Sequence, residues 1–152
     1  HIAGAVQGKE FAEPVKFQAA GRVNPATGTD EFATAMAEFP GGIVAELSCG
    51  STWLNDNAVA IHGTTGWIAV PNPFTPGLGG QAERIFRHRR GAAPEEIAIT
   101  SPDRGLYAYE ADAVADALAG GAREVPLATW ADTTGTARVL DAWLAAVGVS
   151  YA

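Results

Sequence analysis

Residues 31–49, EFATAMAEFPGGIVAELSC, decide the fold of this chain. Residues 31–39 alternate with a period of two, which is the pattern of a half-buried β-strand. One face of this strand carries Phe32, Thr34, Met36 and Glu38, and the other carries Ala33, Ala35 and Ala37. Pro40-Gly41-Gly42 then supplies turn residues before a second apolar run at 43–49. The stretch predicts an antiparallel β-hairpin.

Shorter segments on both sides of this hairpin complete the pattern. Strands are predicted at 15–19, 58–62, 67–70, 83–88 and 96–100, with Gly63-Thr64-Thr65-Gly66 as the turn between the second and the third. From Tyr109 the apolar residues recur every three or four positions, which predicts a helix that ends at Gly120. A second helix is predicted from Thr129, with Asp132 in a capping box, to Gly148. Its apolar stripe is Leu140, Trp143, Leu144 and Val147.

Strands followed by helices indicate an α+β fold. We expect an open, mainly antiparallel β-sheet of five to six or more strands, with two C-terminal helices packed on one face. Two helices leave the second face uncovered, yet the strands are small or apolar on both sides, as at Ala35, Val44 and Ala60. Flat apolar faces are usually covered by another sheet or subunit. We therefore expect a homodimer through the open sheet face, with a lightly apolar solvated face as the alternative.

Composition excludes several classes of function. The chain has 152 residues and 15.7 kDa, which fits one domain, and its 47% hydrophobic and 18% charged residues indicate a folded globule. The net charge is −7, and the one cluster of cations is Arg84, Arg87, Arg89 and Arg90, so no nucleic acid and no membrane partner is expected. No segment resembles a secretory signal, so a cytoplasmic location is expected.

Few residues suggest chemistry of their own. Cys49 lies among strand-like residues and is expected to be a small buried hydrophobe. His62 is expected to be structural, and no histidines or cysteines have the spacing of metal ligands. Aromatic residues just before the first predicted helix and on the proline-rich loop 71–80 could wall a pocket at one end of the sheet; packing in the core or against the loop is the alternative. They are Phe74, Tyr107 and Tyr109.

Seven short motifs occur in the order and at the spacing of one known family. They are TDEF (29–32), FPGG (39–42), AIHGTTGWI (60–68), PNPF (71–74), YEADAV (109–114), TWAD (129–132) and RVLD (138–141). From residue 21 to residue 152, about nine-tenths of the chain, the sequence resembles the C-terminal domain of the Gfo/Idh/MocA oxidoreductase family. That family includes glucose–fructose oxidoreductase and inositol dehydrogenase. The PNPF loop makes the chain most similar to the branch of dimeric dihydrodiol dehydrogenase and xylose dehydrogenase.

The resemblance implies that residues 1–152 form a single C-terminal substrate-binding and dimerisation domain. Residues 1–5 would be the tail of the helix that links it to an N-terminal Rossmann domain, which this sequence lacks. In the family that missing domain holds NAD or NADP, and hydride passes between the nicotinamide and a carbinol carbon of a sugar, polyol or diol. The Glu-Lys-Pro motif with the catalytic lysine does not occur in this sequence, and the family's second polar group lies about two helical turns before His1. No catalytic, cofactor-binding or metal-binding residue is therefore expected in this chain.

The resemblance also implies where the substrate lies and what the chain can do. We expect Phe74, Thr75, Tyr107 and Tyr109 to wall the substrate pocket of an NAD(P)-dependent oxidoreductase. NAD or NADP would bind the full-length parent and not this chain alone, which is expected to be inactive. The alternative is a non-catalytic scaffold or small-molecule-binding module with the same fold.

Overall fold

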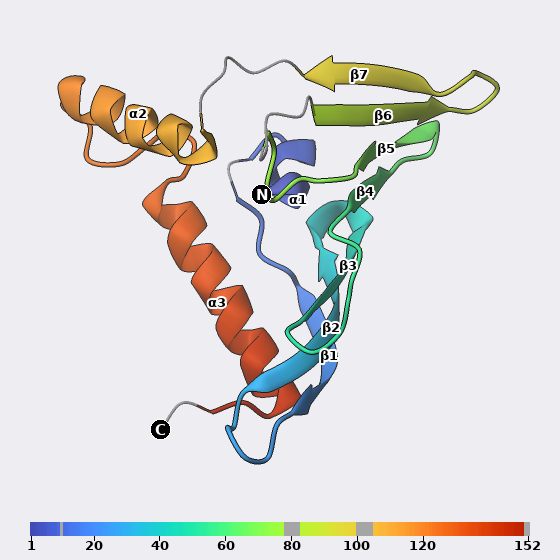
Figure 1. Ribbon diagram of the computed structural model, residues 1–152, viewed down its shortest axis with the longest axis vertical. Coiled ribbons are helices and arrows are strands. Elements are labelled where there is room, and N and C mark those ends of the chain that lie inside the picture. Colours follow the sequence, from blue (N-terminus) through green and yellow to red (C-terminus); the bar gives the residue numbers. More distant parts are fainter. Residues whose placement is uncertain (10, 78–82, 100–104, 151–152) are drawn as a thin grey trace. The chain divides into compact units, whose positions relative to one another are not determined.

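The computed structural model describes residues 1–9, 11–77, 83–99 and 105–150 (Figure 1). The chain divides into two compact units. The first combines His1–Asn55 with Glu124–Ala152, and the second is Asp56–Arg123. Their described residues contain seven antiparallel strands in two open sheets, followed by two C-terminal helices. The α+β class is confirmed, with the strands divided between a sheet of three and a sheet of four.

The first unit begins with a short helix, α1 (Ile2–Val6). The helix continues past Gly4 to Val6, and the chain leaves it through Gly8, which has a φ of +67°. The Gly8 and Lys9 amides donate to the carbonyls of Ala5 and Gly4, which is the Schellman arrangement at a helix C-terminus. Gly4 is buried against the backbone of Phe11, so it serves close packing instead of ending the helix.

The sheet of the first unit contains the predicted hairpin. Its strands are β1 (Lys16–Val23), β2 (Asp30–Phe39) and β3 (Ile43–Gly50), in the order β1-β2-β3. Pro40–Gly42 forms a 3₁₀ turn between β2 and β3, with φ values of +81° at Gly41 and +80° at Gly42. These values explain why two glycines are needed in this turn.

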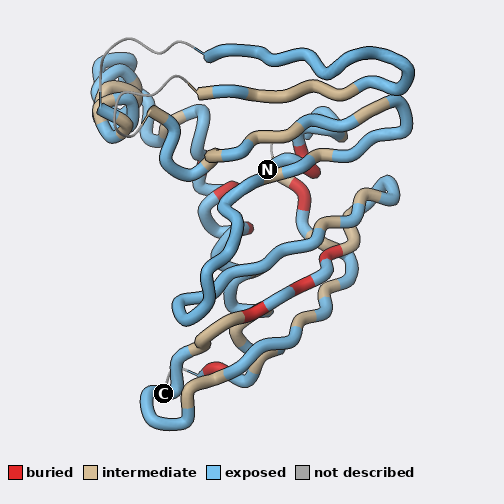
Figure 2. Tube along the Cα trace, turned by 45° about the vertical axis from the view of Figure 1, so that its right-hand side comes forward, coloured by how far each residue is buried: buried red, intermediate tan, exposed pale blue. Residues whose placement is uncertain are grey.

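Helix α3 (Trp130–Val147) covers one face of that sheet. The buried positions of β2 alternate along the strand (Figure 2). They are Ala33, Ala35 and Ala37, with exposed fractions of 2%, 7% and 0%. The rings of Phe17 and Trp143 meet edge to face at 6.1 Å on this side. The expectation that these alanines belong to a face left for a partner is wrong, because small side chains let the helix approach the sheet closely.

The ends of α3 follow the prediction, and so does its apolar stripe except at Leu140, since Trp143, Leu144 and Val147 are all partly buried. The Asp132 amide donates to the Thr129 side chain and the Asp132 carboxylate accepts from the Thr129 backbone, which completes the capping box, and Gly148 has a φ of +85°. Leu140 is half exposed, at 50%. The sheet-facing side includes Gly135, Val139 and Trp143, the first buried and the others partly so.

The second unit contains the four-stranded sheet and α2. The strands β4 (Val59–His62), β5 (Gly66–Val70), β6 (Glu83–Arg89) and β7 (Glu95–Ile99) lie side by side in chain order. Helix α2 (Leu106–Ala119) begins three residues before the predicted start at Tyr109 and has no buried residue. Val114 and Leu118 of the predicted apolar stripe are exposed at 49% and 69%. Residues 78–80 of the proline-rich loop 71–80 and Thr100 of the last predicted strand lie outside the described residues.

The helices of the described segments were also compared with the requirements of a bilayer. None of them combines the length and the apolarity needed to cross a membrane.

Candidate functional site

The loop that carries Phe74 and Thr75 is held by a small network of hydrogen bonds. The Thr75 hydroxyl donates to Asn72 Oδ1 at 2.7 Å, and Asn72 Nδ2 donates to the Thr75 carbonyl at 2.9 Å. Glu83 Oε1, at the start of β6, accepts from the Gly77 amide at 2.6 Å and from Asn72 at 3.4 Å. Phe74 lies between these anchors and is 68% exposed. The loop therefore presents an aromatic ring to its surroundings on an ordered backbone.

The two tyrosines belong to α2. The expectation that they precede the helix is wrong, because α2 begins at Leu106 with Gly105 as its N-cap. Tyr107 is 74% exposed and Tyr109 is 40% exposed. Successive residues of an α-helix are about 100° apart, so two positions spaced by two lie nearly on opposite sides. The tyrosines therefore offer two separate surfaces of α2, and both lie in the same unit as Phe74 and Thr75.

A broad hollow lies on the open face of the first sheet. It has a volume of about 610 Å³ and is lined by side chains of all three strands: Gln18, Ala20, Thr34, Met36, Glu46 and Ser48. Met36 is 47% exposed and lies between Gln18 and Glu46 in the register. The pair Lys16–Glu38, at 2.8 Å, borders this face. The surface is flat and mixed in polarity, which suits another protein surface better than a small molecule.

A smaller hollow lies in the second unit, at the turn between β4 and β5. It has a volume of about 280 Å³, and its lining includes His62, Trp67 and His88. These three residues lie directly opposite one another on adjacent strands. The sequence analysis considered His62 alone and missed this row. The turn at 63–66 fixes which residue of β5 lies opposite His62, so the hairpin register was the signal that could have found it.

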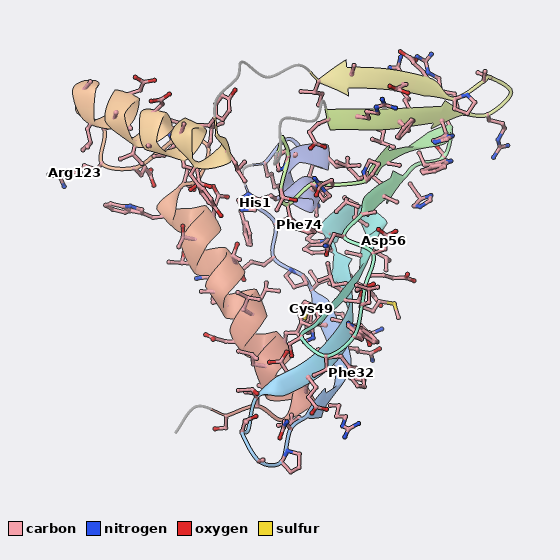
Figure 3. The ribbon with its side chains drawn as sticks, viewed as in Figure 1. His1, Phe32, Cys49, Asp56, Phe74 and Arg123 are labelled. Atoms are coloured by element: carbon pink, nitrogen blue, oxygen red, sulfur yellow. The ribbon has the colours of Figure 1, made fainter. Side chains whose placement is uncertain are left out.

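Asp132 lies in the first turn of α3, and it is buried, with an exposed fraction of 5%. Its Oδ2 accepts from the Thr129 backbone amide at 2.9 Å and from the Thr129 hydroxyl at 2.8 Å. Its Oδ1 faces His1 Nδ1 at 3.5 Å, and the His1 ring meets the edge of Phe11 at 5.6 Å. Asp132 thus caps α3, and His1 packs beside that cap (Figure 3).

Cys49 is exposed, so the expectation of a buried cysteine is wrong. It lies on β3 opposite Ala33, near the end of the strand. Partial burial of the sulfur raises the pKa of the Cys49 thiol above its ordinary value, and the nearby Asp30 carboxylate raises it further. A raised pKa keeps the thiol protonated at neutral pH, which is the opposite of what a catalytic nucleophile needs.

Metal binding was considered for the described residues as well. Across the described ranges, no three side chains of histidine, cysteine, aspartate or glutamate gather as metal ligands would.

Comparisons with known proteins agree with this fold. Residues 10–69 match the family model of the GFO/IDH/MocA C-terminal domain. Beyond this segment, the chain is distantly homologous to dihydrodiol dehydrogenases, of which it matches only the C-terminal part. The resemblance inferred from the seven motifs is confirmed.

The relatives that carry this homology are enzymes of the same name. Trans-1,2-dihydrobenzene-1,2-diol dehydrogenase of Sus scrofa is 30% identical over 146 residues, which cover 91% of this chain and 41% of the relative. The enzyme of that name from Oryctolagus cuniculus is 28% identical, and the match covers 91% of this chain and 42% of that enzyme. The chain thus spans about two-fifths of the length of these relatives.

Solved structures share the fold. KijD10, a 3-ketoreductase from Actinomadura kijaniata solved in complex with NADP and TDP-benzene, superposes with a TM-score of 0.76 at 21% identity, covering 95% of this chain and 42% of that one. UDP-N-acetylglucosamine 3-dehydrogenase GnnA from Acidithiobacillus ferrooxidans superposes with a TM-score of 0.62 at 25% identity, covering 90% and 41%. Both proteins are much longer than this chain, which matches less than half of each.

Proposed function

We propose that this chain is the substrate-binding and dimerisation part of an NAD(P)-dependent oxidoreductase that acts on a sugar, polyol or diol by hydride transfer. The observation that carries the proposal is homology over 91% of the chain to enzymes named as diol dehydrogenases. In this proposal residues 1–152 act as one C-terminal domain in a cytoplasmic enzyme, and residues 1–5 end the helix that connects it to a Rossmann domain.

In this proposal NAD or NADP binds to the Rossmann domain and not to this chain. Rossmann domains are built from parallel βαβ units, whereas all strand pairs in the described part of this chain are antiparallel. The described residues therefore do not fit NAD or NADP, and no step of hydride transfer is assigned to them. The proposed task of this chain is to bind and orient the substrate.

The proposed substrate wall consists of Phe74, Thr75, Tyr107 and Tyr109. The exposed ring of Phe74 offers an apolar face to the C–H groups of a sugar or to the ring of a diol. The Thr75 hydroxyl donates to Asn72, which leaves its oxygen free to accept a hydrogen bond from a substrate hydroxyl. The phenol groups of the tyrosines can both donate and accept.

Phe74→Ala tests this wall in the complete protein that contains this chain. We expect KM for the preferred sugar or diol to rise about tenfold with kcat changed less than about twofold, because the ring contributes binding that substrate and transition state share. Initial-rate kinetics measures both constants. Leu54→Ala is the matched control, because Leu54 is an exposed apolar residue of the first unit. An unchanged KM in Phe74→Ala would remove Phe74 from the substrate wall.

The proposed homodimer uses the open face of the first sheet. Because α3 covers the alanine face, the surface left for a partner is the face of Thr34, Met36 and Glu46. A two-fold axis would place this flat face against its own copy, which is the usual geometry of a symmetric dimer.

Met36→Glu tests the dimer. We expect the dissociation constant measured by analytical ultracentrifugation to rise at least about a hundredfold, since the variant buries an unpaired carboxylate in the interface. Leu140→Glu is the control, because Leu140 is similarly exposed but lies on α3. Ala35 is unsuitable for this test, since a charge there would disrupt the contact with α3. A wild-type chain that stays monomeric at all concentrations would contradict the proposed interface.

A further inference from the structure

Three aromatic side chains form a row across the second sheet. Strands β4, β5 and β6 lie side by side (Figure 1), and His62 of β4, Trp67 of β5 and His88 of β6 are paired directly in their register. The rings of Trp67 and His88 stack with their centroids 3.7 Å apart and their planes at 1°. The rings of His62 and Trp67 stack at 5.7 Å and 17°. The indole thus stacks on both imidazoles, and all three residues border the adjacent hollow.

Cations gather beside this row. Arg89 and Arg90 follow His88 directly and both border the hollow of about 280 Å³, but the Arg89 side chain lies on the face opposite His88, where it approaches Glu95. Arg90 is therefore the cation that the site offers. Arg90 has no ion pair with any residue in the described part of the chain, and its backbone amide donates to the Thr65 carbonyl at 3.0 Å, which ties the strand end to the turn. Arg89 makes only a long contact of 3.5 Å with Glu95.

The neighbouring carboxylates are already committed to other arginines. Glu95 of β7 accepts two hydrogen bonds from Arg87, and these bonds together with the charges of Arg87 and Arg89 hold its pKa below the ordinary value. Glu96 lies 3.4 Å from Arg84. No acidic residue lines the hollow itself, whose remaining lining is the turn with the hydroxyls of Thr64 and Thr65.

The lining of the hollow differs in charge from the whole chain. The net charge of the chain is −7, but exposed charges are screened beyond about 8 Å at physiological ionic strength. The side chains that line the hollow are those of arginine, histidine, tryptophan and threonine, and the nearby Glu95 carboxylate is paired with Arg87. Guanidinium and imidazolium groups bind phosphate oxygens through charge-assisted hydrogen bonds.

We propose that the hollow formed by His62, Trp67, His88, Arg90 and the turn at 63–66 is a binding site for a small anion with two linked phosphoryl groups. The donor row spans two strand spacings, about 10 Å, which exceeds the reach of one phosphate and suits a diphosphate. The proposal is independent of the proposed oxidoreductase function, because all of its residues lie in the second unit and none belongs to the substrate wall.

The charged groups of this sheet divide between its two faces, because side-chain direction alternates along a strand. Arg84 on β6 and Glu96 on β7 lie on the face of the row, and Arg87, Arg89 and Glu95 lie on the opposite face. Strand β5 contributes no charged group beside Trp67.

Isothermal titration of the purified full chain with inorganic pyrophosphate and, separately, inorganic phosphate tests the site. We expect saturable binding with one site, about tenfold tighter for pyrophosphate than for phosphate. Arg90→Gln should weaken pyrophosphate binding at least about fivefold, while Arg84→Gln, on the same strand but paired with Glu96, should leave it within about twofold. Trp67 fluorescence should respond to binding in the wild type, and the response should vanish in Trp67→Phe.

The histidines provide a second readout. The double variant His62→Gln/His88→Gln should weaken pyrophosphate binding at least about fivefold, because two hydrogen-bonding side chains of the hollow are replaced. Circular dichroism of each variant checks that it is folded. The proposal is overturned by absence of saturable binding, by equal affinity for the two anions, or by equal losses in Arg90→Gln and Arg84→Gln, which would indicate unspecific charge attraction.

Discussion

Gly66→Ala lowers the free energy of unfolding of the second unit by about 2–3 kcal/mol, because overpacking of a tight contact has this cost. Gly66 begins β5 and pairs with Arg89 of β6. A Cβ atom at this position would lie 2.0 Å from the His88 carbonyl oxygen and 3.1 Å from the Arg89 Cα. Both are backbone atoms of a paired strand, so the clash cannot be relieved by turning a side chain. The substitution forces β5 and β6 apart at the turn.

Urea unfolding followed by circular dichroism measures this loss. Gly63→Ala is a matched control in the same turn, since a Cβ atom there would lie 3.6 Å from the Gly66 carbonyl oxygen, an ordinary contact. We expect that control to cost less than about 1 kcal/mol. Equal losses in the two variants would show that the close approach at Gly66 does not limit the stability of this hairpin.

Asp132→Ala lowers the free energy of unfolding by about 2 kcal/mol, at the upper end of the range for helix caps. The substitution removes the acceptor of the Thr129 amide and of the Thr129 hydroxyl, and both groups are buried. A buried donor without an acceptor loses its hydrogen bond and cannot recover it from water. The loss weakens the first turn of α3, whose side chains cover the alanine face of the first sheet.

The midpoint of urea unfolding checks this expectation. Asp141→Ala is the control, because Asp141 is an exposed acidic residue in the same helix, and it should change stability by less than about 0.5 kcal/mol. Asp132→Asn should fall between the two, since its amide oxygen can still accept one of the hydrogen bonds. A loss in Asp132→Ala no larger than that in Asp141→Ala would contradict the role of the cap.

Local patterns in the sequence were sufficient for the hairpins and for the ends of α3. The turn glycines and the alternation of residues 31–39 act over a few residues, and the structure has both hairpins where they predict them. The capping box of Thr129 and Asp132 and the stop at Gly148 are also local, and both are present. Such features depend on backbone geometry that neighbouring residues determine.

Features that depend on packing between elements could not be predicted in this way. Alternation shows that Ala33, Ala35 and Ala37 share a face but not which face α3 covers. The spacing of apolar residues placed Trp143 on the packed side of α3 but could not show that Phe17 is its partner, because that contact depends on how the helix fits the sheet. The exposure of Cys49 also depends on the arrangement of the elements, because its strand β3 lies at an edge of the sheet.

The candidate sites also differ in whether they depend on local sequence or on the pairing of distant strands. The sequence singled out Phe74 and Thr75 from their loop, and the structure places them on an anchored turn with the ring exposed. The row of His62, Trp67 and His88 required the register of three strands, the last of which lies far along the chain. Pairing at that separation depends on the whole sheet and not on the residues themselves.

One measurement tests the central claim most directly. The complete protein encoded by the gene of this chain is purified, and the reduction of NAD and of NADP is followed by absorbance with a panel of sugars, polyols and diols. We predict substrate-dependent reduction of one of the two dinucleotides by the complete protein and none by residues 1–152 alone. A complete protein that binds neither dinucleotide, or that reduces neither with any member of the panel, would contradict the assignment and favour a non-catalytic module.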